Sequence, residues 1–287
     1  MRIQVMKRSG TLALVVGSLM AWGCGGEELA LEPGPAEAAG RCGTEAPGAA
    51  ELARVAADSG HEVRAMRLPG TVRVPTYVHV IRKGTGIANG DVPDSAVRAQ
   101  VDVLNAAFRD TPFSFELVAT DRTTHTTWYT MSPGTTAEKQ AKQTLRKGGK
   151  ESLNLYTAAP GGGLLGWATF PWSYASAPKN DGVVMLHSTL PGGTAAPYNL
   201  GDSTVHEVGH WLGLLHTQQG CTGDDGVSDT PNASVSSAVC TEGLDTCPAD
   251  PGLDPIHNYM SNTDDACIHE FTPGQSARMD SMALSYR

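Results

Sequence analysis

The sequence lacks any run of 18 consecutive apolar residues, so no membrane-spanning segment is predicted. Basic residues are also few, because 21 Lys and Arg stand against 30 Asp and Glu, which gives a formal net charge of −9. An acidic chain is poorly suited to neutralise phosphates by counterion release, which argues against binding to nucleic acid. The chain also contains no internal repeat.

What is present is ordinary for a globular protein. Hydrophobic residues make up 40% of the 287 residues and charged residues 18%, which is enough apolar material for a buried core. The length fits one large domain or two small ones. The 33 glycines and 18 prolines are more than an average chain carries, and they predict many loops.

The first 24 residues have the layout of a signal peptide. Basic Arg2, Lys7 and Arg8 precede a short apolar run that ends at the small Gly23. A buried helix is the alternative, but the basic residues before the run argue against it. Cys24 follows directly and resembles the lipid-attachment site of bacterial lipoproteins, although Ala21 and Trp22 depart from the usual residues. Secretion and attachment to the outer surface through a lipid both stay open, and either places the chain in a disulfide-permissive compartment.

Residues 25–70 are predicted to be a linker and a pro-segment. The first part is Glu-, Ala-, Gly- and Pro-rich and has almost no large apolar side chains. An isolated Cys42 follows, and then a weakly helical stretch over residues 46–57. The Arg-containing stretch from Arg64 to Arg73 is a predicted cleavage site that would release the domain behind it.

Residues 71–287 are predicted to form one domain of the α/β class. Alternating, β-branched stretches predict strands, and apolar residues at helical spacing predict helices. Asp94 is expected to cap the first of these helices and Thr272, followed by Pro273, the last. The predicted strands cover residues 71–83, 113–120, 152–159, 163–172 and 181–189, and the predicted helices cover residues 95–110, 135–148, the segment from 200 onward and 272–287.

The stretch HEVGHWLGLLH contains three of the nine histidines within eleven residues. On a helix, His206 and His210 lie one turn apart on the same face, so both imidazoles reach one metal ion. Gly213 allows the helix to stop, and the chain then brings back His216 as a third ligand. Three protein ligands with one open position are typical of a catalytic zinc site. Glu207 lies beside the ligands and is predicted to take a proton from a water on the ion.

With this motif the sequence resembles the metzincin metalloproteases, and within them the pappalysin family in its bacterial ulilysin-like branch. The stretches GWATFPW, DGVVMLHST, HEVGHWLGLLH and NYMSNTDDACIHEFTPGQSARM carry the resemblance. It implies a twisted, mostly parallel sheet with an active-site helix and an irregular lower subdomain. It also implies a methionine turn at Met260 under the metal, and peptide substrates that bind along the edge strand at residues 163–172.

The resemblance also assigns roles to the cysteines. The four after the zinc motif can pair in three ways, and the family implies Cys221 with Cys247 and Cys240 with Cys267. Cys42 resembles the pro-segment cysteine whose thiolate takes the fourth zinc position and keeps the enzyme latent. A free thiol without a role is the alternative for Cys42.

Further implied residues lie in the lower region. Asp225 and Thr230 match a region that binds calcium in the resembled branch, and a solvated acidic loop is the alternative. Asn262 stands where many relatives have a tyrosine that stabilises the oxyanion, so it is the expected oxyanion or pocket residue with a weaker effect. Asp264 and Asp265 are expected near the wall of the specificity pocket, where some relatives bind a basic residue.

The sequence therefore predicts a secreted or surface-anchored zinc endopeptidase that acts on proteins or peptides, works as a monomer and is made as a latent precursor. Two alternatives stay open. One is a surface binding protein whose zinc is structural and whose activity is weak or lost, and Glu207 argues against it because a general base would then have no purpose. The other is a zinc hydrolase of small amides or cell-wall peptides.

Overall fold

The computed structural model describes residues 41–58, 66–234 and 239–287. The predicted signal peptide, Cys24 and the linker up to residue 40 lie outside the described residues, as does Arg64 in the predicted cleavage segment. In the part of the chain that is described, no helix combines the length and the apolar character that crossing a bilayer requires.

The centre of the fold is a five-stranded sheet with the strand order β2-β1-β3-β5-β4. All neighbouring strands pair parallel except β4, which pairs antiparallel with β5 and forms one edge of the sheet. The predicted α/β class with a mostly parallel sheet is confirmed. The strands are β1 (Val72–Arg82), β2 (Phe113–Thr124), β3 (Leu153–Ala158), β4 (Gly166–Ala168) and β5 (Val183–Leu186).

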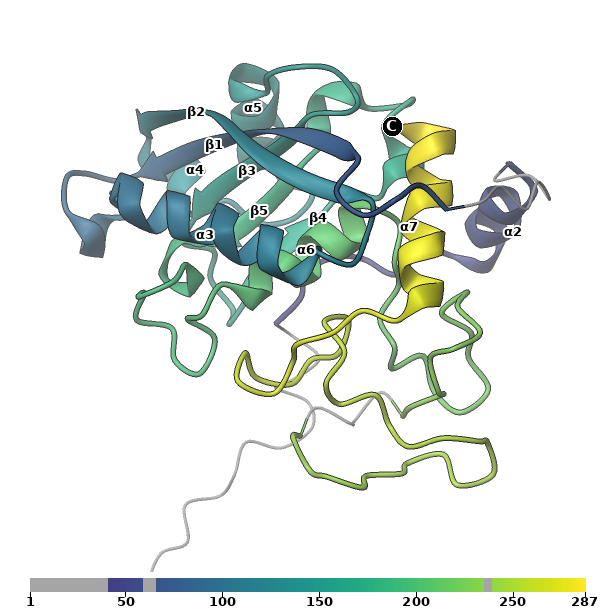
Figure 1. Ribbon diagram of the computed structural model, residues 1–287. Coiled ribbons are helices and arrows are strands. Elements are labelled where there is room, and N and C mark those ends of the chain that lie inside the picture. The colour runs from purple at the N-terminus through teal and green to yellow at the C-terminus, as the bar shows by residue number, and fades with distance from the viewer. Residues whose placement is uncertain (1–40, 59–65, 235–238) are drawn as a thin grey trace, which may run out of the picture. The chain divides into compact units, whose positions relative to one another are not determined.

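Helices cover both faces of this sheet (Figure 1). Side chains alternate along each strand, so that Leu153 and Leu155 of β3 join one apolar cluster while Tyr156 and Ala158 join another. The first cluster contains α3 and α6, and the second contains α4 and α5. The helices are α2 (Ala49–Asp58), α3 (Asp94–Ala107), α4 (Thr126–Tyr129), α5 (Thr136–Leu145), α6 (Asp202–Trp211) and α7 (Pro273–Tyr286), and short 3-10 turns cover Ile87–Asn89, Pro171–Ser173, Pro178–Asn180 and His187–Thr189.

Two local predictions differ from the structure. Asp94 does not cap α3, because Pro93 occupies that position and Asp94 is the first helical residue, where it pairs with Arg122 at 2.5 Å. The strand predicted over residues 163–172 forms only at its centre, since a 3-10 turn starts at Pro171. The cap predicted at Thr272 is present, with Gln275 completing the reciprocal pair of hydrogen bonds.

Between α6 and α7 the described residues form no further helix or strand. This region instead contains two disulfides, which join Cys221 to Cys247 and Cys240 to Cys267. They are the two pairs that the family resemblance implies. Cross-links of this kind stabilise a segment that has few backbone ladders of its own.

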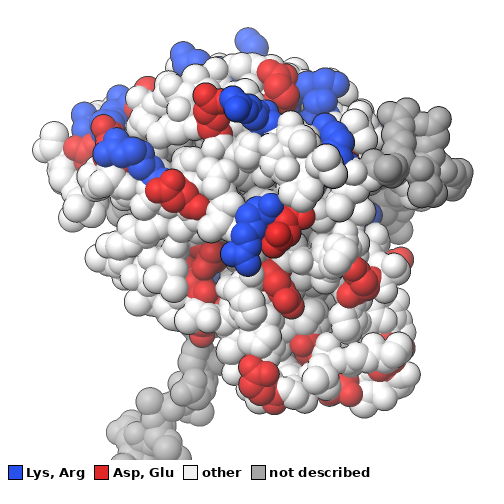
Figure 2. Space-filling model, in the orientation of Figure 1, with Lys and Arg blue, Asp and Glu red and all other residues white. Residues whose placement is uncertain are grey.

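The same region has an unusual charge. No Lys or Arg occurs between α6 and α7, whereas ten Asp and Glu do. Figure 2 shows the consequence on one face, where Lys and Arg gather over the sheet and the lower loops present Asp and Glu. The lower part of the molecule is therefore a source of negative potential.

Candidate metal centre

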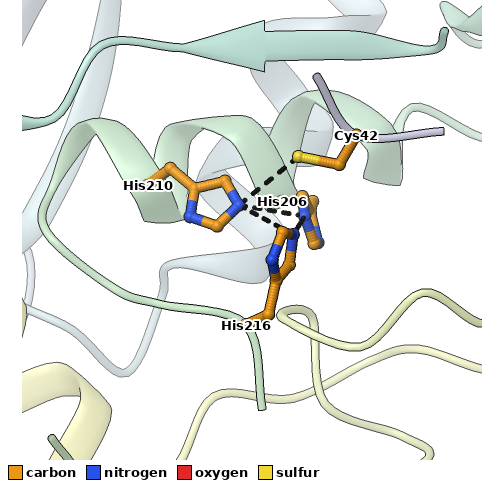
Figure 3. A group of neighbouring side chains, drawn as sticks. All are labelled: Cys42, His206, His210 and His216. Carbon is orange, nitrogen blue, oxygen red and sulfur yellow. Dashed lines mark hydrogen bonds between the residues drawn. The ribbon is translucent and has the colours of Figure 1, made fainter. Parts of the chain in front are cut away.

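Helix α6 and the turn after it position three imidazoles. His206 and His210 lie on one face of α6, one turn apart. The helix ends because Gly213 adopts a left-handed φ of 100°, and a side chain there would collide with Met282 of α7. The chain then reverses and brings His216 back beside the helix, as Figure 3 shows.

The three Nε2 atoms converge on one point. His206 and His210 are separated by 3.2 Å, His210 and His216 by 3.2 Å, and His206 and His216 by 3.1 Å, measured between their Nε2 atoms. Tetrahedral zinc with Zn–N bonds of about 2.0–2.1 Å separates two nitrogen ligands by about 3.3 Å. The spacing of the imidazoles therefore fits a single zinc ion.

The hydrogen bonds of the imidazoles support this fit. The Nδ1 atom of His206 donates to the carbonyl of Tyr259 and that of His210 to the carbonyl of Leu214, both at 2.8 Å. With the proton on Nδ1, the Nε2 lone pairs of these two rings face each other, which is unfavourable unless a cation lies between them. Burial lowers the pKa of His206 to about 4 and that of His216 to about 3, so both rings are neutral at pH 7, the form that binds metal.

Cys42 provides a fourth donor from the N-terminal segment (Figure 3). Its Sγ atom lies 3.6 Å from Nε2 of His210 and belongs with the three histidines to one group of close donor atoms. Sulfur and nitrogen ligands of one tetrahedral zinc lie about 3.6 Å apart when the Zn–S bond is about 2.3 Å. Burial and the Glu207 carboxylate raise the pKa of the Cys42 thiol, whereas a bound zinc would deprotonate a thiol ligand.

Backbone hydrogen bonds hold this N-terminal segment against the edge of the sheet. Gly43 N–H donates to the carbonyl of Gly166 and Leu165 N–H donates to the carbonyl of Arg41, both at 2.8 Å. Residues 41–43 thus pair with β4 in parallel, as a short extra strand. The outward edge of β4 is occupied in this form of the protein, and an extended peptide would need the same hydrogen-bonding groups.

Glu207 is fully enclosed beside the histidines. Its Oε2 atom accepts a hydrogen bond of 2.8 Å from the Thr44 hydroxyl, which itself accepts one from the N–H of Ala168. A Cβ atom on Gly166 would lie 2.9 Å from Cγ of Glu207, so β4 approaches the glutamate as closely as glycine permits. Burial raises the pKa of Glu207 to about 7, which suits a group that accepts and returns a proton.

Met260 lies under the helix, where the methionine turn is expected. The residue is fully buried, and its sulfur would collide with any side chain at Gly209. The Asn258 side chain accepts the N–H of Met260, and the carbonyl of Met260 accepts the N–H of Thr217 at 3.3 Å. The turn thereby supports both the helix and the segment that carries His216.

A pocket opens beside the metal centre on the side of Arg41. Asp202 and Asp265 supply two carboxylates to its lining, and Asn262 and Tyr198 lie there too. Asp265 accepts the N–H of Leu200 at 2.8 Å just before α6 begins, while Asp264 is not among the lining residues. Burial, with the nearby Asp265 carboxylate, raises the pKa of Asp202 to about 7.

Comparison with known proteins identifies the family. The family model Peptidase_M43, described as pregnancy-associated plasma protein-A, matches residues 165–283. An extracellular metalloprotease of Pyricularia oryzae is 46% identical over 219 residues, which cover 75% of this chain and 76% of that protein. One of Verticillium alfalfae is 43% identical over 258 residues, with 86% and 89% covered. The chain belongs to the pappalysin family of metzincins. It is a zinc metalloprotease.

Solved structures agree with this assignment. A promirolysin variant of Tannerella forsythia superposes with a TM-score of 0.69 at 25% identity and covers 84% of this chain and 92% of that one. Mature mirolysin in complex with a cleaved peptide gives a TM-score of 0.63 at 27% identity, with coverages of 73% and 90%. These curated relatives come from fungi and are named extracellular, whereas mirolysin comes from Tannerella forsythia.

The structure brings together most of the predicted site residues of this metzincin, but not Asp264, which does not line the pocket, and not the calcium pair. Asp225 and Thr230 lie apart, in the acidic lower region. There the Asp225 carboxylate accepts hydrogen bonds from Val227 N–H at 2.9 Å and from the Thr230 hydroxyl at 2.7 Å. Within the described ranges, Asp225 does not belong to a group of three or more His, Cys, Asp or Glu close enough to share an ion.

Sequence reasoning missed two residues that touch the site. Thr44 follows Cys42 by two positions, and residues two apart in an extended segment point the same way. Asp202 precedes His206 by four positions, so it shares the ligand face of α6. Both spacings are present in the sequence. The first is informative only once residues 42–44 are known to be extended, and the second only once residues 202–206 are known to be helical.

Proposed function

We propose that this pappalysin is a secreted endopeptidase in which Glu207 acts as the general base and His206, His210 and His216 hold the catalytic zinc. The convergence of three Nε2 lone pairs beside an enclosed carboxylate is the observation that supports the proposal. When bound, zinc supplies Lewis-acid polarisation of the scissile carbonyl and acidifies a water.

The residues of the chain carry the remaining steps. Glu207 removes the proton from the attacking water and then delivers it to the leaving amine. The free edge of β4 binds the substrate backbone, once the pro-segment no longer occupies it. Asn262 replaces the tyrosine that many relatives have, so we expect weaker stabilisation of the oxyanion, with a rate roughly tenfold or more below that of a tyrosine-containing relative.

Hydrolysis of denatured casein tests the proposal. The processed, zinc-replete protein is expected to release soluble peptides with internal cleavage sites, because the edge strand accepts an extended chain from both sides of the cut. Mass spectrometry of the products distinguishes internal cleavage from removal of terminal residues. A folded, zinc-replete and processed protein that leaves casein intact would contradict the proposal.

Latency belongs to the same proposal. Cys42 lies at the fourth position of the donor set, and the pro form of mirolysin covers more of this chain than the mature form does. A thiolate in that position excludes the water that the reaction needs.

We predict that Cys42→Ala makes the precursor process itself earlier. Removal of the sulfur leaves the fourth position open to water, so the full-length chain gains activity before it is cut. The fraction of precursor is measured by gel electrophoresis during expression, with Ser176→Ala on the exposed surface as a control. Identical processing of Cys42→Ala and the control would exclude the latency role.

The specificity pocket favours a basic residue just after the cut. Asp202 and Asp265 place two carboxylates there, the pro-segment puts the cationic Arg41 against the Tyr198 ring at 4.5 Å, and the surrounding region is acidic. The sequence predicted Asp264 and Asp265 as the acidic residues of the pocket, and we propose Asp202 together with Asp265 instead.

We predict that Asp202→Asn reduces kcat/KM for peptides with Arg after the cut about tenfold relative to peptides with Leu there, since one charge-assisted contact is lost. Paired fluorogenic peptides that differ only at this position provide the measurement. Asp264→Asn is the matched control and should leave the Arg-to-Leu ratio unchanged. An unchanged ratio in Asp202→Asn would assign the preference elsewhere.

We propose three further properties of this chain: a calcium site, a lipid anchor and a monomeric state. Calcium at Asp225 and Thr230 would raise the thermal midpoint of the wild type but not that of Asp225→Asn. A lipid at Cys24 of a bacterial surface protein would appear as added mass on the N-terminal fragment, and its absence would leave plain secretion. Elution as a single copy from a sizing column tests the monomer.

A further inference from the structure

A second surface of the catalytic domain, next to the metal centre, also contacts the N-terminal segment. Helix α2 lies against Phe170, Trp172, Leu215 and Met282, with Tyr286 at the border, and we name this set the aromatic shelf. Val55 of α2 is 2% exposed although the helix as a whole lies on the surface. Leu52 is three residues earlier and packs against the same cluster, so one stripe of α2 is apolar.

The shelf has an ordered, partly polar construction. The rings of Phe170 and Trp172 stack with centroids 4.5 Å apart, and Trp172 lies edge-on to Tyr286 at 6.4 Å. The indole N–H of Trp172 donates to Oε1 of Glu51 at 2.8 Å, which fixes α2 along the shelf. An amphipathic helix binds by laying its apolar face against such an apolar surface, and the hydrogen bond to Glu51 adds a directed contact.

The shelf adjoins the metal centre. The ring of Phe170 lies edge-on to His210 with centroids 5.5 Å apart, and Leu215 directly precedes His216. The N-terminal segment therefore touches the catalytic domain at three successive places: residues 41–43 at the edge of β4, Thr44 at Glu207, and α2 on the shelf. None of these contacts involves the chain between α2 and β1.

We propose that the aromatic shelf is a helix-binding site whose ligand is α2, and that residues 41–58 remain bound there as an inhibitor after the chain is cut behind α2. The inhibition of activity in this proposal rests on the proposed function, whereas the binding of residues 41–58 to the shelf does not. Cutting the chain removes the covalent tether and leaves the contacts at β4, at Glu207 and on the shelf in place. Activation then requires a second event, namely digestion of the bound segment or its displacement.

The length of α2 sets the strength expected of this site. A helix of ten residues is only marginally stable in water by itself. The free fragment therefore loses conformational entropy when it binds, which lowers its affinity. The fragment is therefore expected to dissociate once its shelf contacts are weakened, rather than to remain as a permanent subunit. A charge on the apolar stripe should weaken binding by roughly tenfold or more, because it would be buried without a partner.

The test uses the full chain with a recognition sequence for a site-specific protease inserted between residues 60 and 61. The Glu207→Gln background prevents self-digestion and retains an oxygen that can accept from Thr44. After complete cutting at micromolar concentration, size-exclusion chromatography separates bound from free fragment. We expect the fragment to elute with the catalytic domain, and to elute alone when it carries Val55→Asp.

Ala53→Asp is the matched control, because residue 53 is an exposed position of the same helix. It should elute with the domain, as the unsubstituted fragment does. Glu51→Ala provides a second variant that removes the acceptor of the Trp172 bond, and it should raise the free fraction to an intermediate level. Release of the unsubstituted fragment, or equal retention of Val55→Asp and Ala53→Asp, would overturn the proposal.

A parallel arm with Glu207 intact separates this proposal from the proposed function. The cut protein is assayed on casein directly and after a dilution that frees the fragment. Low activity that rises on dilution supports both proposals. A fragment that stays bound in the first arm, with no activity at any dilution, would leave the shelf proposal standing and contradict the protease mechanism.

Discussion

Replacement of Glu207 by Gln is expected to reduce casein hydrolysis by the processed protein by about 10²–10⁴-fold, the usual contribution of a general base. Gln has the same shape and keeps a carbonyl oxygen near the position of Oε2, so the packing against Gly166 is retained. It has no basic site, however, and cannot take the proton of the attacking water. The loss should therefore appear in kcat, with KM little changed.

Two measurements make this prediction specific. The zinc content of Glu207→Gln, measured by atomic absorption, should equal that of the wild type, because the carboxylate is not among the converging donors. Glu116→Gln on β2 has an exposed side chain and should retain full activity. Equal hydrolysis by wild type and Glu207→Gln would remove Glu207 from the mechanism, even if the metal is essential.

The centre was predictable from sequence because one local element builds most of it. His206 and His210 need only a helix to share a face, and Gly213 signals its end. The third ligand needs only a reversal of the chain, so His216 follows from the same eleven residues. The spacing of the three histidines was therefore enough to predict their convergence without knowledge of any tertiary contact.

The pocket was less predictable because its parts come from distant segments. Asp265 was named from the sequence, but its position against the start of α6 depends on the irregular, disulfide-linked region folding back. Propensity and periodicity say little about such a region. Asp94 shows the opposite limit, since a strong capping residue was displaced by one position when Pro93 took the cap.

The contact between α2 and the aromatic shelf lay beyond sequence reasoning altogether. The helix itself was expected near residues 46–57, but its partners are Phe170, Leu215 and Met282, which lie in three separate segments of the chain. From the sequence alone, the apolar side chains of these residues are equally consistent with a place in the core of the domain. Only the fold shows that α2, rather than another part of the domain, covers them.

Removal of zinc is expected to abolish activity completely, and to do so reversibly. Without the cation, the Nε2 lone pairs of His206, His210 and His216 face one another at 3.1–3.2 Å. Dialysis against a chelator should reduce casein hydrolysis to background, and addition of one equivalent of zinc should restore it. Titration of the returning activity against added metal then counts the ions that the reaction needs.

The same experiment should change stability. Because zinc binds only the folded chain, its removal lowers the free energy of unfolding by the amount that zinc binding contributes. This contribution is about 4 kcal/mol for a ligand at 1,000 times its Kd. The thermal midpoint of the precursor should fall on chelation, and in Cys42→Ala it should fall by less, since that variant contributes one zinc donor fewer. If the thermal midpoint of both proteins stays unchanged on chelation, the imidazoles converge for packing alone. Full activity without stoichiometric zinc would lead to the same conclusion.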